Sequence, residues 1–441
     1  MKQARALFKP DGNHQPTRTM SSFKRIIICC DGTWNKPDTD LSDGDSSTNV
    51  CRFYLDLKDR DNSGIEQRKF YLSGVGSGEH DKFRGGAFGW GLSAKMMQGY
   101  DFLIRNYQPG DRIYLFGFSR GAYTARSLGG LIRNCGILRT MDEDGNPLPD
   151  KEIKRRRKLA LKRYRSRSDE DHPDSETSKA FRRQYCLEDT RDPEDPRNGN
   201  VDLAPDIPFI ECIGVWDTVG SLGVPFLRYK LLQLLGFHWR FHDVRLSSSV
   251  RNAFHAIAIH ERRTDFQPVL WLQVPRLPET VQRLEQVWFN GVHSDIGGGY
   301  PERGLSDISL QWMVEKAQSC GLDFKEELFN DLDPQPGAQQ HESFAGVFER
   351  LDRWRGKGVG KSRSYLASIP IGEDSRLECR DSKAANTIQQ CHSGQRLHES
   401  VIERFLDGHL RDFPASVLAE ILFQIAEQND GRLIRRRPQR Q

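Results

Sequence analysis

The stretch of residues 111–126 constrains the fold of this chain more than any other segment. It reads DRIYLFGFSRGAYTAR and contains Gly117, Ser119 and Gly121 in the spacing G-x-S-x-G. An apolar, β-prone run precedes the motif, and an amphipathic run, 122–132, follows it. The pattern predicts a strand, a sharp turn that carries the serine, and a helix. The two glycines remove side chains that would clash where the strand and the helix approach each other.

The same spacing also occurs where a serine merely caps a helix, which is a common role for this residue. The strand before Ser119 and the helix after it favour a different interpretation, the nucleophile elbow of an α/β-hydrolase fold. The elbow interpretation makes a second prediction, because a nucleophilic serine needs partner residues elsewhere in the chain.

The rest of the chain alternates between strand-like and helix-like segments. Strands are predicted at 25–30, 69–72, 113–116, 209–216 and 284–289, where the runs are continuously apolar as in parallel sheets. Helices are predicted from residue 48 onward and over 92–107, 122–132, 248–260, 304–320 and 414–428. This rhythm predicts an α/β fold: an α/β-hydrolase-like, doubly wound and mostly parallel sheet, with a charged insertion after the nucleophile-elbow helix.

Changes in composition divide the 441 residues into four parts. Residues 1–22 are predicted to be a disordered leader and 23–320 the catalytic domain, in which 138–205 form an insertion or lid. Residues 321–430 are polar with one amphipathic helix, and we expect them to be an extension packed on that domain. Residues 431–441 form a basic tail that we interpret as frayed and solvated.

Charge and cysteine content exclude several classes of protein. A net charge of +4 argues against a dedicated nucleic-acid binder. Nine scattered cysteines without a C-x-x-C pair favour reduced, buried thiols, and neither a metal nor a cofactor is predicted. The N-terminus lacks an apolar signal-peptide core, and no apolar run is long enough to cross a membrane. We expect a protein that is cytoplasmic as synthesised, and no pattern fixes its oligomeric state.

Three predicted strands end in a polar residue near a glycine, in the chain order serine, aspartate, histidine. These residues are Ser119, Asp217 and His293. In an open α/β sheet, ligands bind beyond the carboxyl ends of the strands, so the three side chains are expected to meet there. A serine hydroxyl needs a base, an imidazole supplies one near neutral pH, and a carboxylate holds the imidazole tautomer. The sequence therefore predicts a triad that cleaves acyl esters.

Each triad assignment has a plainer alternative. His293 could be a structural loop histidine, and Asp217 could be a helix N-cap carboxylate. Asp295 is a competing acid, but it lies so close to His293 in sequence that we expect it to shape the loop. Asp31 ends the first strand and is expected, with Gly117 and Gly121, to support the site.

The oxyanion hole of such a site needs two backbone N–H donors. One is predicted to be the amide of Arg120, the residue after the nucleophile. The other is expected from Gly32 and Thr33, in the loop after the first strand.

The insertion contains a strongly basic segment. Residues 151–168 hold ten Lys or Arg and one acid, with apolar residues between them. A solvated helix followed by a loop is the plain interpretation. The position after the elbow helix also fits a lid over the site, and the positive charge fits peripheral membrane contact with anionic head groups.

Seven segments, in order along the chain, resemble one known family. They are CDGTWN (30–35), TNV (48–50), SGVGSG (73–78), GFSRGAYTAR (117–126), GVWDTVGSLG (214–223), HAIAIHERRTDFQP (255–268) and WFNGVHSDIGGGY (288–300). Together they resemble an α/β-hydrolase family that includes the type VI secretion phospholipase effectors, over about 23–320. The resemblance implies Ser119, Asp217 and His293 as catalytic residues, phospholipase A-like cleavage of lipid or phospholipid esters, and export by a contractile secretion system.

Three other functions stay open on the residues alone. A general intracellular carboxylesterase would use the same triad. A metal-dependent phosphatase could use Asp31, but the second acid that such an enzyme needs two residues later is Thr33. A non-catalytic binding protein of hydrolase fold would have no reason to keep all three triad residues. A phosphate-loop-like run at 356–362 lacks its first glycine, because position 355 is an arginine.

Overall fold

The computed structural model describes residues 23–32, 47–74, 88–166, 168–188, 210–219, 245–263, 266–272, 281–343 and 395–407. Seven strands in this part of the chain form one parallel sheet in the order β2-β1-β3-β4-β5-β6-β7. They are β1 (Arg25–Cys30), β2 (Gln67–Leu72), β3 (Arg112–Phe118), β4 (Ile210–Trp216), β5 (Val250–Ala258), β6 (Arg283–Phe289) and β7 (Gln395–Leu397). The strand order reverses between β1 and β3, which is the place where open α/β sheets bind ligands.

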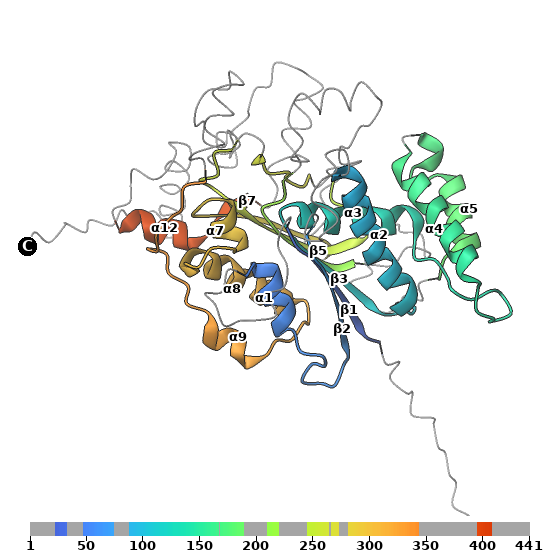
Figure 1. Ribbon diagram of the computed structural model, residues 1–441, viewed down its shortest axis with the longest axis horizontal. Helices are drawn as coiled ribbons and strands as arrows, with labels where there is room; N and C mark the ends of the chain where they lie inside the picture. Colours follow the sequence, from blue (N-terminus) through green and yellow to red (C-terminus); the bar gives the residue numbers. More distant parts are fainter. Residues whose placement is uncertain are drawn as a thin grey trace, which may run out of the picture.

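Helices cover both faces of this sheet (Figure 1). One face carries α2 (Phe88–Asn106) and α3 (Arg120–Cys135), with α4 (Asp150–Arg165), the short 3-10 helix η1 (Asp169–Asp171) and α5 (Glu176–Tyr185) stacked outside α3. The other face carries α1 (Asn49–Asp56), α7 (His293–Gly297), α8 (Gly304–Ser319) and α9 (Glu326–Asp331). Helix α12 (Glu399–Leu406) lies beside β7. The α/β fold class predicted from the sequence is confirmed.

Strand β1 shows why the predicted strands are continuously apolar. Ile26, Ile28 and Cys30 pack into the core beneath α2 and α3, whereas Ile27 and Cys29 pack into the core beneath α1 and α8. All six residues of β1 are buried, because helices cover both faces of the sheet. The seven cysteines in the described part of the chain are likewise buried, as thiols rather than disulfides.

One predicted helix is wrong. Residues 248–260 contain strand β5, which pairs with β4 and β6 in the middle of the sheet. Its run of Ala, Ile and Phe residues is buried on both sides, and hydrophobic periodicity alone cannot separate such a strand from a buried helix. The other predicted strands and the helices starting at residues 48, 92, 122 and 304 are present with small shifts in their ends. The predicted helix at 414–428 lies outside the described residues.

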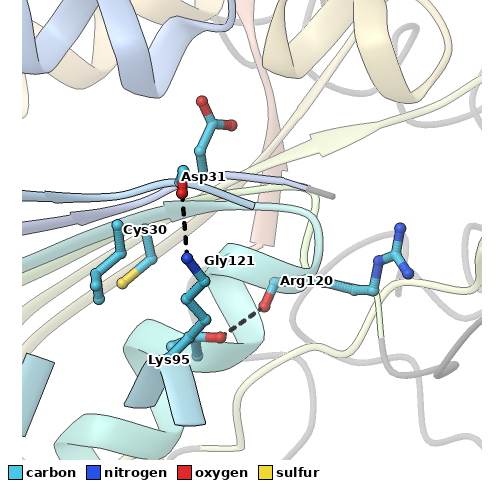
Figure 2. Close-up of a pocket in the computed structure, with 8 residues that line it drawn as sticks. Cys30, Asp31, Lys95, Arg120 and Gly121 are labelled. Carbon is cyan, nitrogen blue, oxygen red and sulfur yellow. Dashed lines mark hydrogen bonds between the residues drawn. The ribbon is translucent and has the colours of Figure 1, made fainter. Parts of the chain in front are cut away.

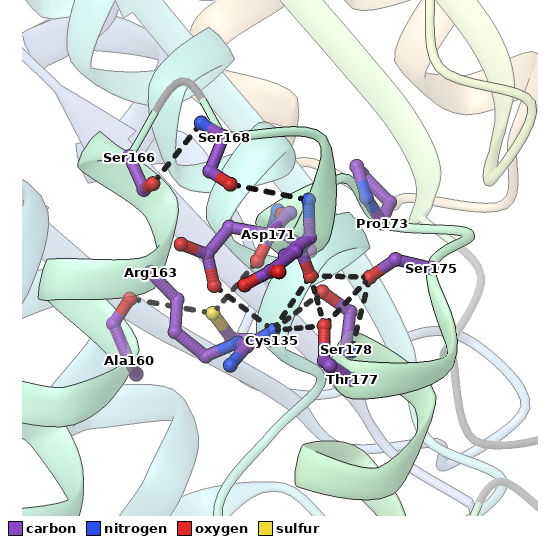
Figure 3. A network of polar contacts seen from close by, with 12 residues as sticks. Cys135, Ala160, Arg163, Ser166, Ser168, Asp171, Pro173, Ser175, Thr177 and Ser178 are labelled. Carbon is purple, nitrogen blue, oxygen red and sulfur yellow. Dashed lines mark hydrogen bonds and ion pairs between the residues drawn. The ribbon is translucent and has the colours of Figure 1, made fainter.

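The described part of the insertion after α3, residues 138–166 and 168–188, packs on the domain. Ile153 and Ala160 of α4 and Phe181 of α5 join the core beneath α3. Arg163 of α4 pairs with Asp171 at 3.0 Å and donates to Ser178 Oγ at 2.9 Å, which ties α4, η1 and α5 together (Figure 3). No helix in the described ranges is long and apolar enough to cross a bilayer.

The motif glycines let α3 start directly against the sheet. A Cβ on Gly121 would lie 2.0 Å from the carbonyl oxygen of Cys30, at the end of the neighbouring strand β1. A Cβ on Gly117 would lie 2.6 Å from the carbonyl carbon of Gly121. Both contacts are with backbone atoms, which cannot rotate away, so the G-x-S-x-G spacing is a packing requirement.

We expect Gly121→Ala to lower the free energy of unfolding by about 3 kcal/mol or more, because the methyl group forces α3 away from β1. Gly337→Ala is the matched control, since nothing lies within 4 Å of its added Cβ. Chemical denaturation of both variants measures the difference. Equal denaturation midpoints would contradict this account of the elbow.

Candidate active site

The three predicted catalytic residues follow three strands at the carboxyl edge of the sheet. Ser119 follows β3, Asp217 follows β4, and His293 opens α7 after β6. The Ser119 amide donates to the Trp216 carbonyl at 3.0 Å, which joins the ends of β3 and β4. The ring of Phe118 lies 4.6 Å from the imidazole of His293, centroid to centroid, so the elbow strand and α7 are in contact.

Two of these residues have strained backbones. Ser119 has a φ of 56° and Asp217 a φ of 38°, and no other non-glycine residue in the described ranges has a positive φ. Such conformations cost about 1–3 kcal/mol each and concentrate at functional sites. The strain arises where the chain turns sharply from strand to helix or loop and still presents a side chain at the sheet edge.

Asp217 and His293 are joined directly. Asp217 Oδ2 lies 2.5 Å from His293 Nδ1, and Asp217 Oδ1 accepts from the Ala258 amide at 3.1 Å. The aspartate is fully buried and the histidine is 5% exposed. This contact fixes the ring orientation and leaves Nε2 as the nitrogen that can exchange a proton with a substrate or nucleophile. The described contacts include no hydrogen bond between Ser119 Oγ and the imidazole.

Two phenylalanines enclose the imidazole of His293. Phe118 lies against it at an angle of 33°, and Phe266 meets it edge-on with ring centroids 5.0 Å apart. Burial lowers the pKa of His293 below its ordinary value of 6.5, and the nearby Asp217 carboxylate opposes that shift. The imidazole is therefore neutral at neutral pH, which is the state that a general base requires.

The two predicted oxyanion donors differ in their surroundings. The Arg120 amide lies at the start of α3, directly after Ser119. The Gly32 amide instead donates to Asp31 Oδ1 at 2.5 Å, and Thr33 lies outside the described residues.

The guanidinium of Arg120 extends away from β1 (Figure 2), and burial lowers its pKa to about 10.

Asp31 connects three elements beneath the sheet edge. Its Oδ2 accepts from the Thr48 hydroxyl at 2.6 Å and from the hydroxyl of Tyr71 on β2. Thr48 in turn caps α1 by accepting from the Cys51 amide. Asp31 is 4% exposed, and its carboxylate points away from Lys95 (Figure 2). These contacts hold β1, β2 and α1 together. In the described ranges, no group of three His, Cys, Asp or Glu side chains lies close enough together to hold a metal ion.

Two carboxylates flank the backbone of His293. Asp295 Oδ2 accepts from the Val292 amide at 2.9 Å, and Glu261 Oε2 accepts from the His293 amide at 3.2 Å. Sequence reasoning named Asp295 but missed Glu261, although Glu261 lies inside the segment HAIAIHERRTDFQP that carries the family resemblance. In the sequence Glu261 is only a glutamate followed by two arginines, and nothing there indicates that it is buried or which residue it contacts.

We expect the imidazole of His293 to titrate below pH 6.5 in a histidine NMR titration of the folded protein. Asp217→Asn removes the carboxylate that favours the imidazolium, so this substitution should lower the pKa of His293 further. An increase in the pKa of His293 in Asp217→Asn would contradict the pairing.

One curated relative is similar to part of this chain. The chain is 27% identical over 293 residues to the uncharacterized protein YEL023C of Saccharomyces cerevisiae, covering 61% of this chain and 36% of that protein. The chain thus spans about a third of the length of this curated relative.

Two solved structures are similar at a TM-score of 0.40 each. One is an uncharacterized protein from Pseudomonas aeruginosa, 16% identical, with 93% of this chain and 66% of that chain covered. The other is the Tle1 effector bound to the VgrG spike of the type 6 secretion system, 13% identical, with 84% of each chain covered.

The family model described as "T6SS, Phospholipase effector Tle1-like, catalytic domain" matches residues 24–316. This match contains the elbow, Asp217 and His293, and it bears out the resemblance seen in the sequence. The chain belongs to the family of Tle1-like phospholipase effector catalytic domains.

Proposed function

We propose that this protein is a serine hydrolase that cleaves acyl esters of lipids or phospholipids through Ser119, His293 and Asp217. The observation that carries the proposal is the buried contact of 2.5 Å between Asp217 Oδ2 and His293 Nδ1. It lies at the sheet edge where the strained Ser119 follows β3. Membership of a phospholipase effector family supports lipid esters as the substrate class.

In the proposed reaction, His293 Nε2 takes the proton of the Ser119 hydroxyl as Oγ attacks the ester carbonyl carbon. The imidazolium is stabilised by Asp217 and then gives its proton to the leaving alkoxide, so that an acyl-enzyme remains. Water, deprotonated by the same imidazole, attacks the acyl carbon and releases the fatty acid with Ser119 restored. The proposed reaction requires Ser119 Oγ to come within hydrogen-bond reach of the imidazole when substrate binds, since catalytic hydrogen bonds are often long without substrate.

The backbone amide of Arg120 is the proposed first oxyanion donor. The Gly32 amide already donates to Asp31, so the second donor is either this amide after a shift of the Asp31 carboxylate or the amide of Thr33. Each such donor typically lowers the barrier by about 2.7–4 kcal/mol. Since these donors belong to the main chain, Arg120→Ala should impair turnover less than Ser119→Ala.

The contacts of Asp31 fit a structural role better than the role of a nucleophile in the alternative phosphatase function. Both of its carboxylate oxygens accept hydrogen bonds, from Gly32, Thr48 and Tyr71. A nucleophilic aspartate would have to give up some of these bonds to attack phosphorus. A general carboxylesterase would use the same triad as a phospholipase, so only the substrate range separates those two functions.

We expect Ser119→Ala and His293→Ala to abolish release of fatty acid from mixed phospholipids and of p-nitrophenol from short-chain esters. Asp217→Asn should reduce kcat by about 10⁴-fold, because the imidazole loses its tautomer and orientation. Turnover assays with product identification measure these effects, and circular dichroism checks that each variant is folded. Full activity in His293→Ala would refute the proposed base.

Labelling with a fluorophosphonate probe separates the remaining alternatives. We expect the probe to modify Ser119 in the wild-type protein and not in His293→Ala. If the folded wild-type protein is not labelled, the serine hydrolase is excluded. Phosphatase activity that survives Ser119→Ala and depends on Mg²⁺ would then favour Asp31, whereas no turnover at all would favour a binding protein.

We also propose that α4 contacts the anionic surface of a lipid substrate. Four lysines, Lys151, Lys154, Lys158 and Lys162, are exposed and recur every three or four residues, so they share one side of the helix. We call this side the α4 lysine face. None of the four forms an ion pair with another described residue, whereas Ile153 and Ala160 pack into the core on the opposite side.

The family's name links its members to type VI secretion, and we extend that delivery route to this chain as part of the proposal.

We expect Lys154→Gln combined with Lys158→Gln to weaken binding to vesicles of anionic phospholipid by about tenfold or more, since each basic residue near such a surface contributes about 1 kcal/mol. The matched control is Lys179→Gln with Arg183→Gln, which removes the same charge from α5. Co-sedimentation at low and high salt measures both. Equal binding by the two variants would place the contact elsewhere on the protein.

A further inference from the structure

The segment that follows α9 returns to the loop of His293. Residues 341–343 lie beyond the part of the chain, 24–316, that matches the family model. His341 contacts Asp295, and Ser343 contacts Glu261. These are the two carboxylates that accept hydrogen bonds from the backbone amides of Val292 and His293. We call residues 341–343 the strap.

The first half of the strap fixes Asp295. His341 Nδ1 lies 2.6 Å from Asp295 Oδ1, and the His341 amide donates to Oδ2 at 3.2 Å. The imidazole of His341 stacks on Tyr300, with centroids 3.9 Å apart and an angle of 18°. Gly291 leaves room for this arrangement, because a Cβ there would lie 2.3 Å from the Asp295 Cβ. Asp295 therefore has one set position, from which it also accepts the Val292 amide.

The second half of the strap reaches Glu261, which is fully buried. Ser343 Oγ lies 3.0 Å from both carboxylate oxygens, and Arg263 donates to them from its side chain at 2.8 and 2.9 Å. The guanidinium of Arg263 lies 3.6 Å above the ring of Phe266, which packs edge-on against the imidazole of His293. Glu261 is therefore connected to His293 in two ways. It accepts a hydrogen bond from the His293 backbone amide, and it binds Arg263, which lies on Phe266 beside the imidazole.

We propose that the strap positions His293 as the catalytic base, with His341 and Ser343 as positioning residues. The proposal rests on the proposed serine hydrolase function. Its physical basis is that a buried carboxylate keeps one orientation only while its hydrogen-bond donors are in place. Without His341, Asp295 loses a side-chain donor and can rotate, and the loop that carries His293 relaxes with it. A misplacement of about 1 Å at a catalytic group can reduce the rate on the order of a hundredfold.

The test compares two full-length variants that each keep half of the His341 side chain's contacts. His341→Phe keeps the stack on Tyr300 and removes the donor to Asp295, whereas His341→Asn keeps a donor and removes the stack. Glu302→Gln is the control, because Glu302 contacts only the other nitrogen of His341, at 3.3 Å. Two quantities are measured: the inactivation kinetics with a fluorophosphonate probe, and the low-field NMR resonance of the proton between His293 Nδ1 and Asp217.

We expect His341→Phe to lower the maximal rate of Ser119 modification about tenfold to a hundredfold without changing the probe's half-saturation concentration. The low-field resonance should shift or broaden in the same variant. His341→Asn should recover most of the rate, and Glu302→Gln should match the wild type. A purely structural role would change folding stability but not this division between rate and binding.

A folded His341→Phe protein with wild-type kinetics and an unchanged resonance would overturn the proposal. If His341→Phe does not fold, Ser343→Ala tests the same strap through Glu261, with the same two readouts. If the wild type is not labelled at all, the hydrolase proposal fails, yet the resonance still reports whether the strap orients His293. The two failures are therefore distinguishable.

Discussion

The rest of the site depends on the contact between α3 and the end of β1. At Gly121 the helix backbone approaches the Cys30 carbonyl so closely that no Cβ fits between them. Because α3 must begin this close to the sheet, the chain turns within a single residue after β3, and Ser119 takes its positive φ. The same turn leaves the Ser119 amide on the Trp216 carbonyl, next to the residue that holds His293. One steric constraint thus sets both the strain and the location of the proposed nucleophile.

The three buried acids around His293 have different roles, which follow from the groups that each of them contacts. Asp217 lies against the imidazole itself and accepts a hydrogen bond from the Ala258 amide. Asp295 and Glu261 hold the backbone of the loop and do not touch the ring nitrogens. Burial raises the pKa of Asp295, while donors from Val292 and His341 oppose the shift. Since each carboxylate is satisfied by named donors, three acids can lie close together in a largely apolar setting.

Much of the fold and part of the candidate site could be predicted from the sequence, as particular strands and residues show. Strand β1 was predictable because both of its faces are buried and its apolar run is unbroken. The contact between Asp217 and His293 was predictable because the strands before them end at the same edge of the sheet. Strand β5 was not, because a short run of Ala, Ile and Phe suits a buried helix equally well. The roles of Glu261 and His341 could not be predicted, since they arise from partners up to 82 residues away in the chain.

The strap also changes how the part of the chain after residue 316 relates to the site. Arg404 of α12 donates to the carbonyls of Pro336 and Ala338, just before the strap, at 3.0 and 2.8 Å. Asn290, just before the loop of His293, donates to the Ser400 carbonyl at 3.1 Å, and β7 extends the sheet beside β6. Helix α12 therefore contacts both the segment before the strap and the segment before the loop of His293. If the proposed base is His293, its placement depends on residues outside the family's common domain, and variation there would alter rate without altering the triad.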